Sequence, residues 1–383
     1  MTLPHDDLAV AWRDARLPTA GVHLDTAACS RQSTRVLDAV AQHARHEAEI
    51  GGYVAQVAAE PLLRQGRAAL GGLLGATADD VAFVESATVA LTLLLACWPL
   101  RTGATVAAVP GEWGPNLAAF ADRGLTLATL PVDGAGRVDL EALPGWLAST
   151  RPDLVHVTVV SSHRGVLQPA AEVGSACEQA GVPLVLDVAQ ALGHVDCDLL
   201  TRGADAAYGT SRKWLAGPRG VGFLAVRPGL AGQLVPVAPA ASPERWPAAA
   251  GLPPAQRLES AEAHVAGRLG LALAAGEHLA AGPERVRARL AALGRMARGL
   301  LAGAGGWSVV DPPQEPVAVV TLAPPAGVTV AETRARLLTV GVVTTAAGPE
   351  RAPREMTGPV LRVSPHVDAT VDDLEALAAE LAA

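Results

Sequence analysis

Apolar residues in the first two thirds of the chain follow two alternating patterns. Short, almost continuous apolar runs predict buried strands, and segments with apolar residues every three or four positions predict helices between them. The predicted strands are 80–84, 105–109, 126–130, 154–160, 183–187, 204–208 and 221–226, and the predicted helices are 33–49, 61–74, a segment ending at 98, 116–123, 140–149 and 170–180. Apolar strands joined by helical crossovers are typical of a mostly parallel sheet covered on both faces, so we expect an α/β fold.

The pattern changes after the last of these strands. Residues 231–256 are rich in Pro and Ala and predict a loop that crosses the molecule. A long helical region follows at 260–302, broken at Gly282-Pro283, and the strands 317–322, 342–345 and 360–363 with the helices 330–340 and 371–381 predict a small α/β lobe. We therefore predict an N-terminal arm (1–22, with a helix at 8–16), a large domain (23–256) and a small C-terminal domain (257–383).

Composition narrows the class of protein. Half of the 383 residues are hydrophobic, but no apolar run is long enough for a membrane span, and we expect no secretory signal. The net charge of −8 argues against nucleic acid and anionic membranes as partners. The four cysteines have no metal-binding spacing and indicate buried thiols in a reducing cytoplasm. We expect a cytoplasmic protein with a small-molecule ligand and no metal.

Lys213 is the only lysine, although Lys and Arg together number 30. Arginine serves wherever a positive charge alone is needed, but a guanidinium stays protonated, whereas a desolvated amine can attack a carbonyl group. The sequence therefore marks Lys213 as a candidate catalytic amine. The alternative is a surface lysine left over by a compositional bias.

Other candidate residues follow predicted strands, where ligands of parallel sheets bind. Asp187 ends an apolar strand, where a carboxylate needs a partner, and Trp113 and Ser162 follow two other strands. Ala87-Thr88 follow a strand and begin a helix, whose free N–H groups suit a phosphate. The alternatives are ordinary helix capping by Asp187, and by Ser86 or Thr88.

Several motifs together resemble the class V aminotransferase and cysteine desulfurase family of pyridoxal-phosphate (PLP) enzymes. They are Leu24-Asp-Thr-Ala-Ala28, Ala87-Thr88, Asp187-Val-Ala-Gln190, Thr210-Ser-Arg-Lys213, Gly217-Pro-Arg-Gly-Val-Gly222 and Leu361-Arg-Val-Ser364, in the family's order over roughly residues 23 to 370. The resemblance implies PLP fold type I, with a mostly parallel seven-stranded sheet flanked by helices, a small C-terminal α/β domain, and a homodimer.

The resemblance also implies roles for individual residues. Lys213 would carry the cofactor as a Schiff base, Asp187 would pair with the ring nitrogen, and Gln190 would bind the ring oxygen. The implied cofactor-binding residues are Ala87, Thr88, Trp113, Ser162, Asp187, Gln190, Thr210, Arg212 and Lys213, and the implied substrate-binding residues are Ala28, Tyr53 and Arg362. Outside the resemblance, Ala28 could belong to an ordinary turn, Tyr53 could pack over a helix end, and Arg362 could be a solvated strand residue.

The chain departs from the family in three places. Desulfurases carry a persulfide-forming cysteine in their C-terminal part, but no cysteine follows Cys197 here. The segment Arg257–Ala263 replaces a Gly-Thr pair that contacts phosphate across the dimer, and Ser162 stands where desulfurases have Asn.

Within the family, the chain resembles the PLP-dependent carbon–sulfur lyases of ergothioneine biosynthesis. The stretches that carry this likeness are 25–33, 43–53, 209–215 and 262–268. The likeness implies β-elimination from a hercynylcysteine sulfoxide, whose trimethylammonium group could lie against Tyr53, Trp113, Trp214 or Trp246. The alternatives are another class V enzyme (an aminotransferase, an epimerase, or a cysteine desulfurase or selenocysteine lyase) and a non-catalytic relative.

Overall fold

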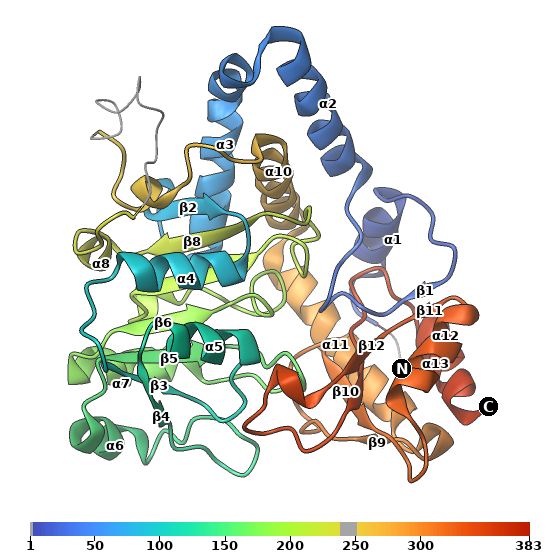
Figure 1. Ribbon diagram of the computed structural model, residues 1–383. Coiled ribbons are helices and arrows are strands. Elements are labelled where there is room, and N and C mark those ends of the chain that lie inside the picture. Colours follow the sequence, from blue (N-terminus) through green and yellow to red (C-terminus); the bar gives the residue numbers. More distant parts are fainter. Residues whose placement is uncertain (1–2, 238–250) are drawn as a thin grey trace.

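A computed structural model describes residues 3–237 and 251–383 of the protein. Its centre is a seven-stranded sheet in the order β2-β8-β7-β6-β5-β3-β4 (Figure 1). The strands are β2 (Val81–Val84), β3 (Thr105–Ala108), β4 (Thr126–Thr129), β5 (Leu154–Thr158), β6 (Leu184–Asp187), β7 (Ala206–Thr210) and β8 (Gly222–Val226). Strand β8 is antiparallel to both of its neighbours, and the other pairs are parallel. The predicted α/β fold with a mostly parallel sheet is confirmed.

Both faces of this sheet are buried, which explains the almost continuous apolar strands. Successive residues of a strand enter two different cores. In β5, Leu154 lies in one core and Val155 in the other, and in β6, Val185 and Leu186 are divided in the same way. The helices α4 (Ala87–Cys97) and α5 (Gly114–Asp122) cover the first face, and α6 (Leu143–Thr150) and α7 (Ala170–Ala180) contribute to the core of the second.

A long helical hairpin projects from the body of the molecule (Figure 1). It consists of α2 (Thr34–Ile50) and α3 (Gly52–Leu74), separated by Gly51, whose φ of 92° favours glycine. Helix α3 begins well before the predicted start at Pro61, because a proline inside a helix resembles a first-turn proline in sequence. The helix α10 (Val265–Ala281) packs against both arms of the hairpin, and α11 (Pro283–Leu301) follows the predicted break.

The C-terminal part forms a second, antiparallel sheet in the order β12-β13-β10-β9. Its strands are β9 (Ser308–Val309), β10 (Val320–Ala323), β12 (Thr345–Ala347) and β13 (Val360–Val363), and the helices α12 (Val330–Thr339) and α13 (Val371–Ala382) accompany it. Short connecting helices are η1 (Ala78–Asp80), η2 (Leu200–Arg202), α8 (Pro228–Ala231), η4 (Ala255–Leu258), η5 (Ala304–Gly306) and η6 (Pro349–Arg351).

The N-terminal arm lies against the C-terminal part. Helix α1 (Asp6–Asp14) places Arg13 within 2.9 Å of the Asp368 carbonyl oxygen, and β1 (Val22–His23) pairs in parallel with β11 (Val342–Val343). The domain boundaries at 22 and 256 stay predictions, and half of the predicted loop 231–256, the part 238–250 that includes Trp246, lies outside the described residues. Among the residues described, no helix is long and apolar enough to cross a bilayer.

Candidate active site

The register of the sheet brings the predicted cofactor residues to one edge. Val84 at the end of β2 is paired with Gly222, and Gly222 is paired with Thr210 at the end of β7. In the neighbouring strands, Asp187 is paired with both Tyr208 and Thr158. The segments that follow β2, β7 and β6 therefore leave the sheet side by side.

The start of α4 is built to approach β8 closely. Ser86 caps the helix by accepting a hydrogen bond from the Val89 N–H at 3.2 Å. A Cβ atom on Gly222 would lie 3.0 Å from the carbonyl carbon of Ser86, so a side chain there would push the helix start away. The alternative of capping is thus realised by Ser86, while the first-turn N–H groups of Ala87 and Thr88 remain available to an anion.

The loop that carries Lys213 is held from several sides. The Arg212 carbonyl oxygen accepts from the Ser30 N–H at 2.7 Å, and the Ser211 carbonyl oxygen accepts from the Gly217 N–H at 3.0 Å. Trp214 is fully buried and stacks on His194 with ring centroids 3.8 Å apart. This packing anchors the residue next to the lysine and fixes where the amine emerges.

The electrostatic surroundings favour a neutral amine at Lys213. Burial lowers the pKa of Lys213 to about 7; the attraction of Asp187 opposes this shift, and the charges of Arg212, Arg362 and Arg351 add to it. Within the described part of the chain, its Nζ has no hydrogen-bond partner. An amine with a pKa near neutrality can act as a nucleophile or a general base, which a leftover surface lysine cannot.

Asp187 is a buried carboxylate at the end of β6. Its Oδ1 accepts from the Ala189 N–H at 2.8 Å and its Oδ2 accepts from the Asn116 amide at 3.0 Å. Burial raises its pKa, and the charge of Lys213 and these hydrogen bonds oppose that increase. A cationic ring nitrogen beside Asp187 would favour the ionised carboxylate, so this environment fits the protonated pyridine of PLP.

A buried polar network that the sequence analysis missed lies behind Asp187. Glu112 is fully buried and accepts from Asn116 at 2.9 Å and from the Thr158 hydroxyl at 2.5 Å. His156 lies between Glu112 Oε2 and the Tyr208 hydroxyl, at 2.9 Å from each. Burial raises the pKa of Glu112, but the charge and hydrogen bond of His156 overcome that effect and leave the pKa lowered.

Arg362, in β13, contacts the segment that follows β5. Its Nη1 donates to the Ser162 carbonyl oxygen at 2.7 Å, and its Nη2 lies 3.3 Å from the Thr345 hydroxyl and 3.5 Å from Asp25 Oδ1. Among the described residues, Arg362 Nε and the Ser162 hydroxyl are buried without a hydrogen-bond partner. These two groups can bind a polar ligand, and the fully buried Arg362 is not the solvated strand arginine of the alternative.

Gln190 connects the turn after β1 to the lysine loop. Its amide nitrogen donates to the Ala27 carbonyl oxygen at 2.9 Å, and its oxygen accepts from the Trp214 indole at 2.9 Å. Ala28, next in the turn, is half-buried. Since Trp214 has no exposed surface, its ring supports the loop and does not face a substrate cation.

Two of the candidate aromatic residues that the structure describes keep exposed surface. Trp113 is half-buried at the start of α5, and the guanidinium carbon of Arg351 lies 5.6 Å from its ring centroid. Tyr53 is 59% exposed at the start of α3, and its hydroxyl donates to Glu262 at 2.6 Å. The roles of Trp113 beside the cofactor and of Tyr53 beside the substrate stay predictions.

The residues present fit PLP in three respects. The first turn of α4, Thr210 and Arg212 offer donors for a phosphate, Asp187 offers a carboxylate for a ring nitrogen, and Lys213 offers the amine. Arg212 is half-buried, and burial lowers its pKa, an effect that a nearby dianion would reverse. The cofactor-binding roles of individual residues remain expectations.

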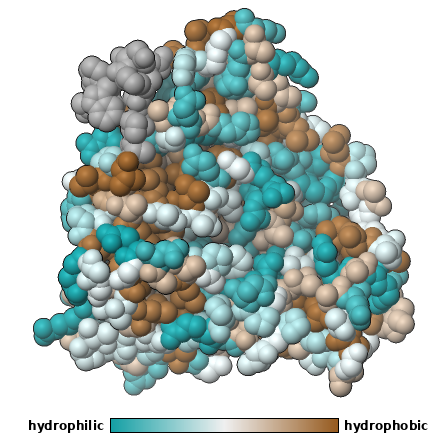
Figure 2. All heavy atoms as spheres, viewed as in Figure 1, coloured by the Kyte–Doolittle hydropathy of each residue, from teal (hydrophilic) through white to brown (hydrophobic). Residues whose placement is uncertain are grey.

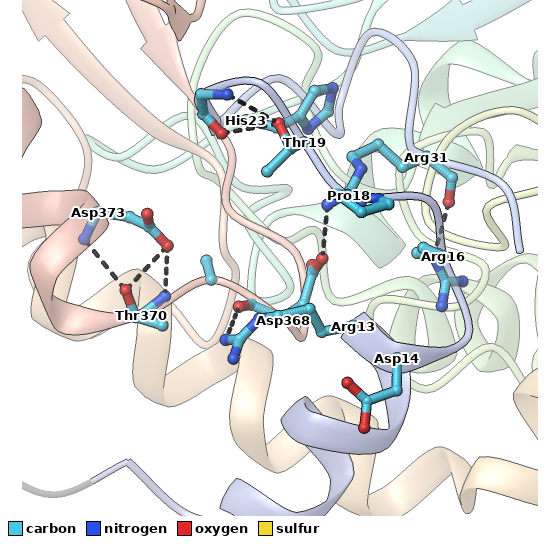
Figure 3. A pocket seen from close by; sticks show the side chains of 12 residues that line it. Arg13, Asp14, Arg16, Pro18, Thr19, His23, Arg31, Asp368, Thr370 and Asp373 are labelled. Carbon is cyan, nitrogen blue, oxygen red and sulfur yellow. Dashed lines mark hydrogen bonds and ion pairs between the residues drawn. The ribbon is translucent and has the colours of Figure 1, made fainter.

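A cavity of about 820 Å³ lies elsewhere, between the N-terminal arm and the residues before α13 (Figure 3). Its arginines already have partners: Arg31 pairs with the Asp368 carboxylate at 3.1 Å, and Arg16 donates to the Arg31 carbonyl oxygen at 2.8 Å. None of the predicted site residues lines this cavity, and its satisfied charges do not indicate a phosphate site.

The comparisons with known proteins agree with this geometry. The aminotransferase class-V family model matches residues 22–377. A probable hercynylcysteine sulfoxide lyase from Mycobacterium tuberculosis (strain CDC 1551 / Oshkosh) is 53% identical over 99% of this chain and 94% of its own length. The isopenicillin N epimerase of Streptomyces clavuligerus is 29% identical over 86% of this chain and 88% of its own.

Solved structures share the fold. A cysteine desulfurase from Thermococcus onnurineus NA1 superposes with a TM-score of 0.85 at 20% identity, covering 100% of this chain and 98% of its own. The cystine C-S lyase C-DES superposes with a TM-score of 0.82 at 18% identity, covering 95% and 97%. The predicted PLP fold type I is confirmed, and the chain belongs to the aminotransferase class-V family of pyridoxal-phosphate enzymes.

Proposed function

We propose that this pyridoxal-phosphate carbon–sulfur lyase cleaves the sulfoxide of hercynylcysteine by β-elimination. The observation that carries the proposal is the 53% identity, over nearly the whole chain, to a probable hercynylcysteine sulfoxide lyase. The candidate site supports it because Lys213, Asp187 and Arg362 supply an amine, a carboxylate and a guanidinium in one region.

The cofactor, when bound, supplies the electron sink that allows bonds at the substrate Cα to break heterolytically. We assign its phosphate to the first turn of α4 (Ala87 and Thr88), with Thr210 and Arg212. Trp113 would cover its ring, Asp187 would pair with the ring nitrogen, and Gln190 and Ser162 would bind the ring oxygen.

Lys213 moves the proton in this scheme. A pKa of about 7 leaves a large share of the amine unprotonated at neutral pH, so Nζ can accept the Cα proton. The Cβ–S bond then breaks, and its electron pair leaves with the sulfur as a sulfenate. The remaining three-carbon fragment takes up water and gives pyruvate and ammonia.

Arg362 orients the substrate by its α-carboxylate. Its Nη1 and Nη2 are held by the Ser162 carbonyl oxygen and by Thr345, which leaves Nε without a partner among the described residues. A guanidinium fixed in this way presents a directed donor to a carboxylate. Ala28, in the turn that Gln190 holds, forms part of the entrance.

The sulfur needs no acceptor on the protein. Of the four cysteines, Cys97, Cys177 and Cys197 are buried, and burial raises the pKa of each thiol. The sulfenate leaves with the negative charge on its oxygen, and two equivalents of an external thiol then reduce it to ergothioneine, with a disulfide and water as the other products.

Product analysis tests this function against other class V activities. Incubation of the holoenzyme with synthetic hercynylcysteine sulfoxide, without a keto acid, should release pyruvate and ammonia in equal amounts. A requirement for a keto-acid acceptor would indicate an aminotransferase, and inversion at Cα without pyruvate would indicate an epimerase. Alanine and persulfide from cysteine would indicate a desulfurase.

We also propose that the protein is a homodimer through the tip of the α2–α3 hairpin. Apolar side chains gather at this tip (Figure 2), and Ile50, Val54 and Val57 are 42%, 59% and 54% exposed. A second copy would cover them and bring Tyr53 and Glu262 toward a shared site. Light scattering should give twice the monomer mass, and Val54→Glu with Val57→Glu should halve it.

The free thiols further support a cytoplasmic location. All four cysteines are unpaired, and three of them are buried in the two cores. Such thiols are stable in a reducing compartment. Fractionation of cells that express the protein should find it with cytoplasmic markers.

A further inference from the structure

We infer that Arg351 is a specificity-determining residue that binds a second carboxylate of the substrate, on the part that leaves with the sulfur. This inference rests on the proposed function and extends it. Arg351 lies in η6, between β12 and β13, and no motif drew attention to it.

Three guanidinium groups surround the lysine. Arg212, Arg351 and Arg362 all lower the pKa of Lys213 by their charge. Arg351 also opposes the charge of Arg362 more strongly than any other residue does. Such a concentration of like charge in a partly buried site is costly unless anions neutralise it.

Two of these cations are neutralised by the anions that any PLP-dependent reaction of an amino acid brings. A cofactor phosphate takes Arg212, and the α-carboxylate of an amino acid takes Arg362. Asp25 is already shared by Arg362 and Thr345, since its Oδ1 accepts from both. The charges of Asp25 and Glu350 also act on Arg351, but neither carboxylate accepts a hydrogen bond from it among the described residues, so its donors can bind a further anion.

The guanidinium of Arg351 is available to a ligand. It is half-buried and lies over Trp113, with 5.6 Å from its central carbon to the ring centroid. In the described part of the chain, it donates no hydrogen bond. A planar fork held over an aromatic ring beside the lysine suits a carboxylate.

The backbone that carries Arg351 is held against the large domain. A Cβ atom on Gly114 would lie 2.1 Å from the Glu350 carbonyl oxygen, so α5 and η6 touch through main-chain atoms. Further along the segment, Glu355 accepts from His163 at 2.7 Å and forms an ion pair with Arg164. These contacts hold the segment that carries Arg351 against the large domain, with Arg351 over Trp113.

Hercynine is the betaine of histidine, so a hercynylcysteine sulfoxide carries one carboxylate on its cysteine part and a second on its leaving part. The second carboxylate distinguishes this substrate from simple cysteine S-conjugates. Its capture by Arg351 would select the substrate through the group that departs.

The test compares two substrates on three proteins. The substrates are hercynylcysteine sulfoxide and the analogue in which hydrogen replaces the hercynyl carboxylate. The proteins are the wild-type holoenzyme, Arg351→Met, and the matched control Arg354→Met, which changes an exposed arginine of the same segment. We expect Arg351→Met to lower kcat/KM for the full substrate about 10- to 100-fold, as for a charge-assisted hydrogen bond, mainly through KM.

The same variant should change kcat/KM for the analogue less than about twofold, and Arg354→Met should leave both substrates unaffected. Arg351→Lys should recover part of the loss, because it keeps the charge but not the fork. Equal losses on both substrates, or a raised Kd for PLP in Arg351→Met, would place Arg351 at the α-carboxylate or the phosphate and overturn the inference. If the wild-type enzyme releases pyruvate from neither substrate, the proposed function itself fails, and the inference fails with it.

Discussion

Asn116 donates a hydrogen bond from its side-chain amide to Asp187 Oδ2 at 3.0 Å. The same amide nitrogen lies 2.9 Å from Glu112 Oε1 and so serves both carboxylates. Glu112 is among the charges that raise the pKa of Asp187. Asn116 is therefore a neutral link that separates two buried negative groups and orients the one that faces the cofactor.

Replacement of Asn116 should weaken cofactor binding. In Asn116→Ala, Asp187 loses one of its two hydrogen bonds, and loss of a bond to a charged group typically costs about 1.5–3 kcal/mol. We expect the Kd for PLP, measured by absorbance titration, to rise about tenfold or more. Asn116→Asp should have a larger effect, because it adds a third carboxylate. An unchanged Kd in both variants would show that Asn116 does not support Asp187.

The Glu112–His156 pair should contribute to stability. Loss of a hydrogen bond to a buried charged group typically costs about 1.5–3 kcal/mol, so Glu112→Gln and His156→Gln should each lower the free energy of unfolding by that order. The exposed Glu85→Gln serves as the control. Urea denaturation at neutral pH measures the three differences.

The pH dependence of this contribution follows from the lowered pKa of Glu112. A carboxyl group with a lowered pKa in the folded state stabilises the protein above its ordinary pKa of 4.5, and this stabilisation is lost as the pH falls through the folded value. The gap between wild type and Glu112→Gln should therefore narrow in acid. A gap that widens as the pH falls would contradict the assigned charge.

The sequence predicted those parts of the site whose signal is local. Lys213, Asp187 and Gln190 lie in short motifs, and the strands were found because both faces of the sheet are buried. The sequence places His156 in a strand but does not indicate its role, because its partner Glu112 precedes it by 44 positions and meets it only when β5 lies beside β3. Arg351 depends on the packing of η6 against α5, which no pattern in the chain encodes.

The ionisation of Lys213 can be followed by measuring the stability of the apoprotein as a function of pH. The Lys213 amine has an ordinary pKa of 10.5, lowered to about 7 in the folded apoprotein by burial. Between these values the unfolded chain binds more protons, so the stability of the apoprotein rises with pH across this window. Lys213→Met removes this dependence.

We therefore expect apo Lys213→Met to be more stable than the wild type at pH 7, with a difference that shrinks toward pH 10.5. Thermal unfolding of both apoproteins across this range measures it, and groups common to both proteins cancel. A constant difference would mean that Lys213 keeps its ordinary pKa in the folded protein.

Lys213→Ala should remove turnover. General-base help is worth about 10²–10⁴-fold, and the variant loses the amine that carries the cofactor as well. Borohydride reduction of the wild-type holoenzyme should attach the cofactor to a single peptide, since the chain has one lysine. Pyruvate release by Lys213→Ala at more than about a tenth of the wild-type rate would remove Lys213 from this role.

Cys29 should be dispensable for catalysis. It is the one half-buried cysteine of the four and follows the turn that Gln190 holds. The next residue, Ser30, donates its N–H to the Arg212 carbonyl oxygen at 2.7 Å. In β-elimination the sulfur leaves with its own electron pair, so no thiol of the protein has to accept it. We expect Cys29→Ala to keep kcat and KM for the sulfoxide within about twofold of the wild type, because the small change in volume leaves the backbone contacts in place.

Cys97→Ala provides a control for thiol loss at a buried position, and pyruvate release measures all three proteins. A loss of more than about 100-fold in Cys29→Ala alone, together with a persulfide on Cys29 in the wild-type enzyme during turnover, would show sulfur transfer to the protein and place its chemistry with that of the desulfurases.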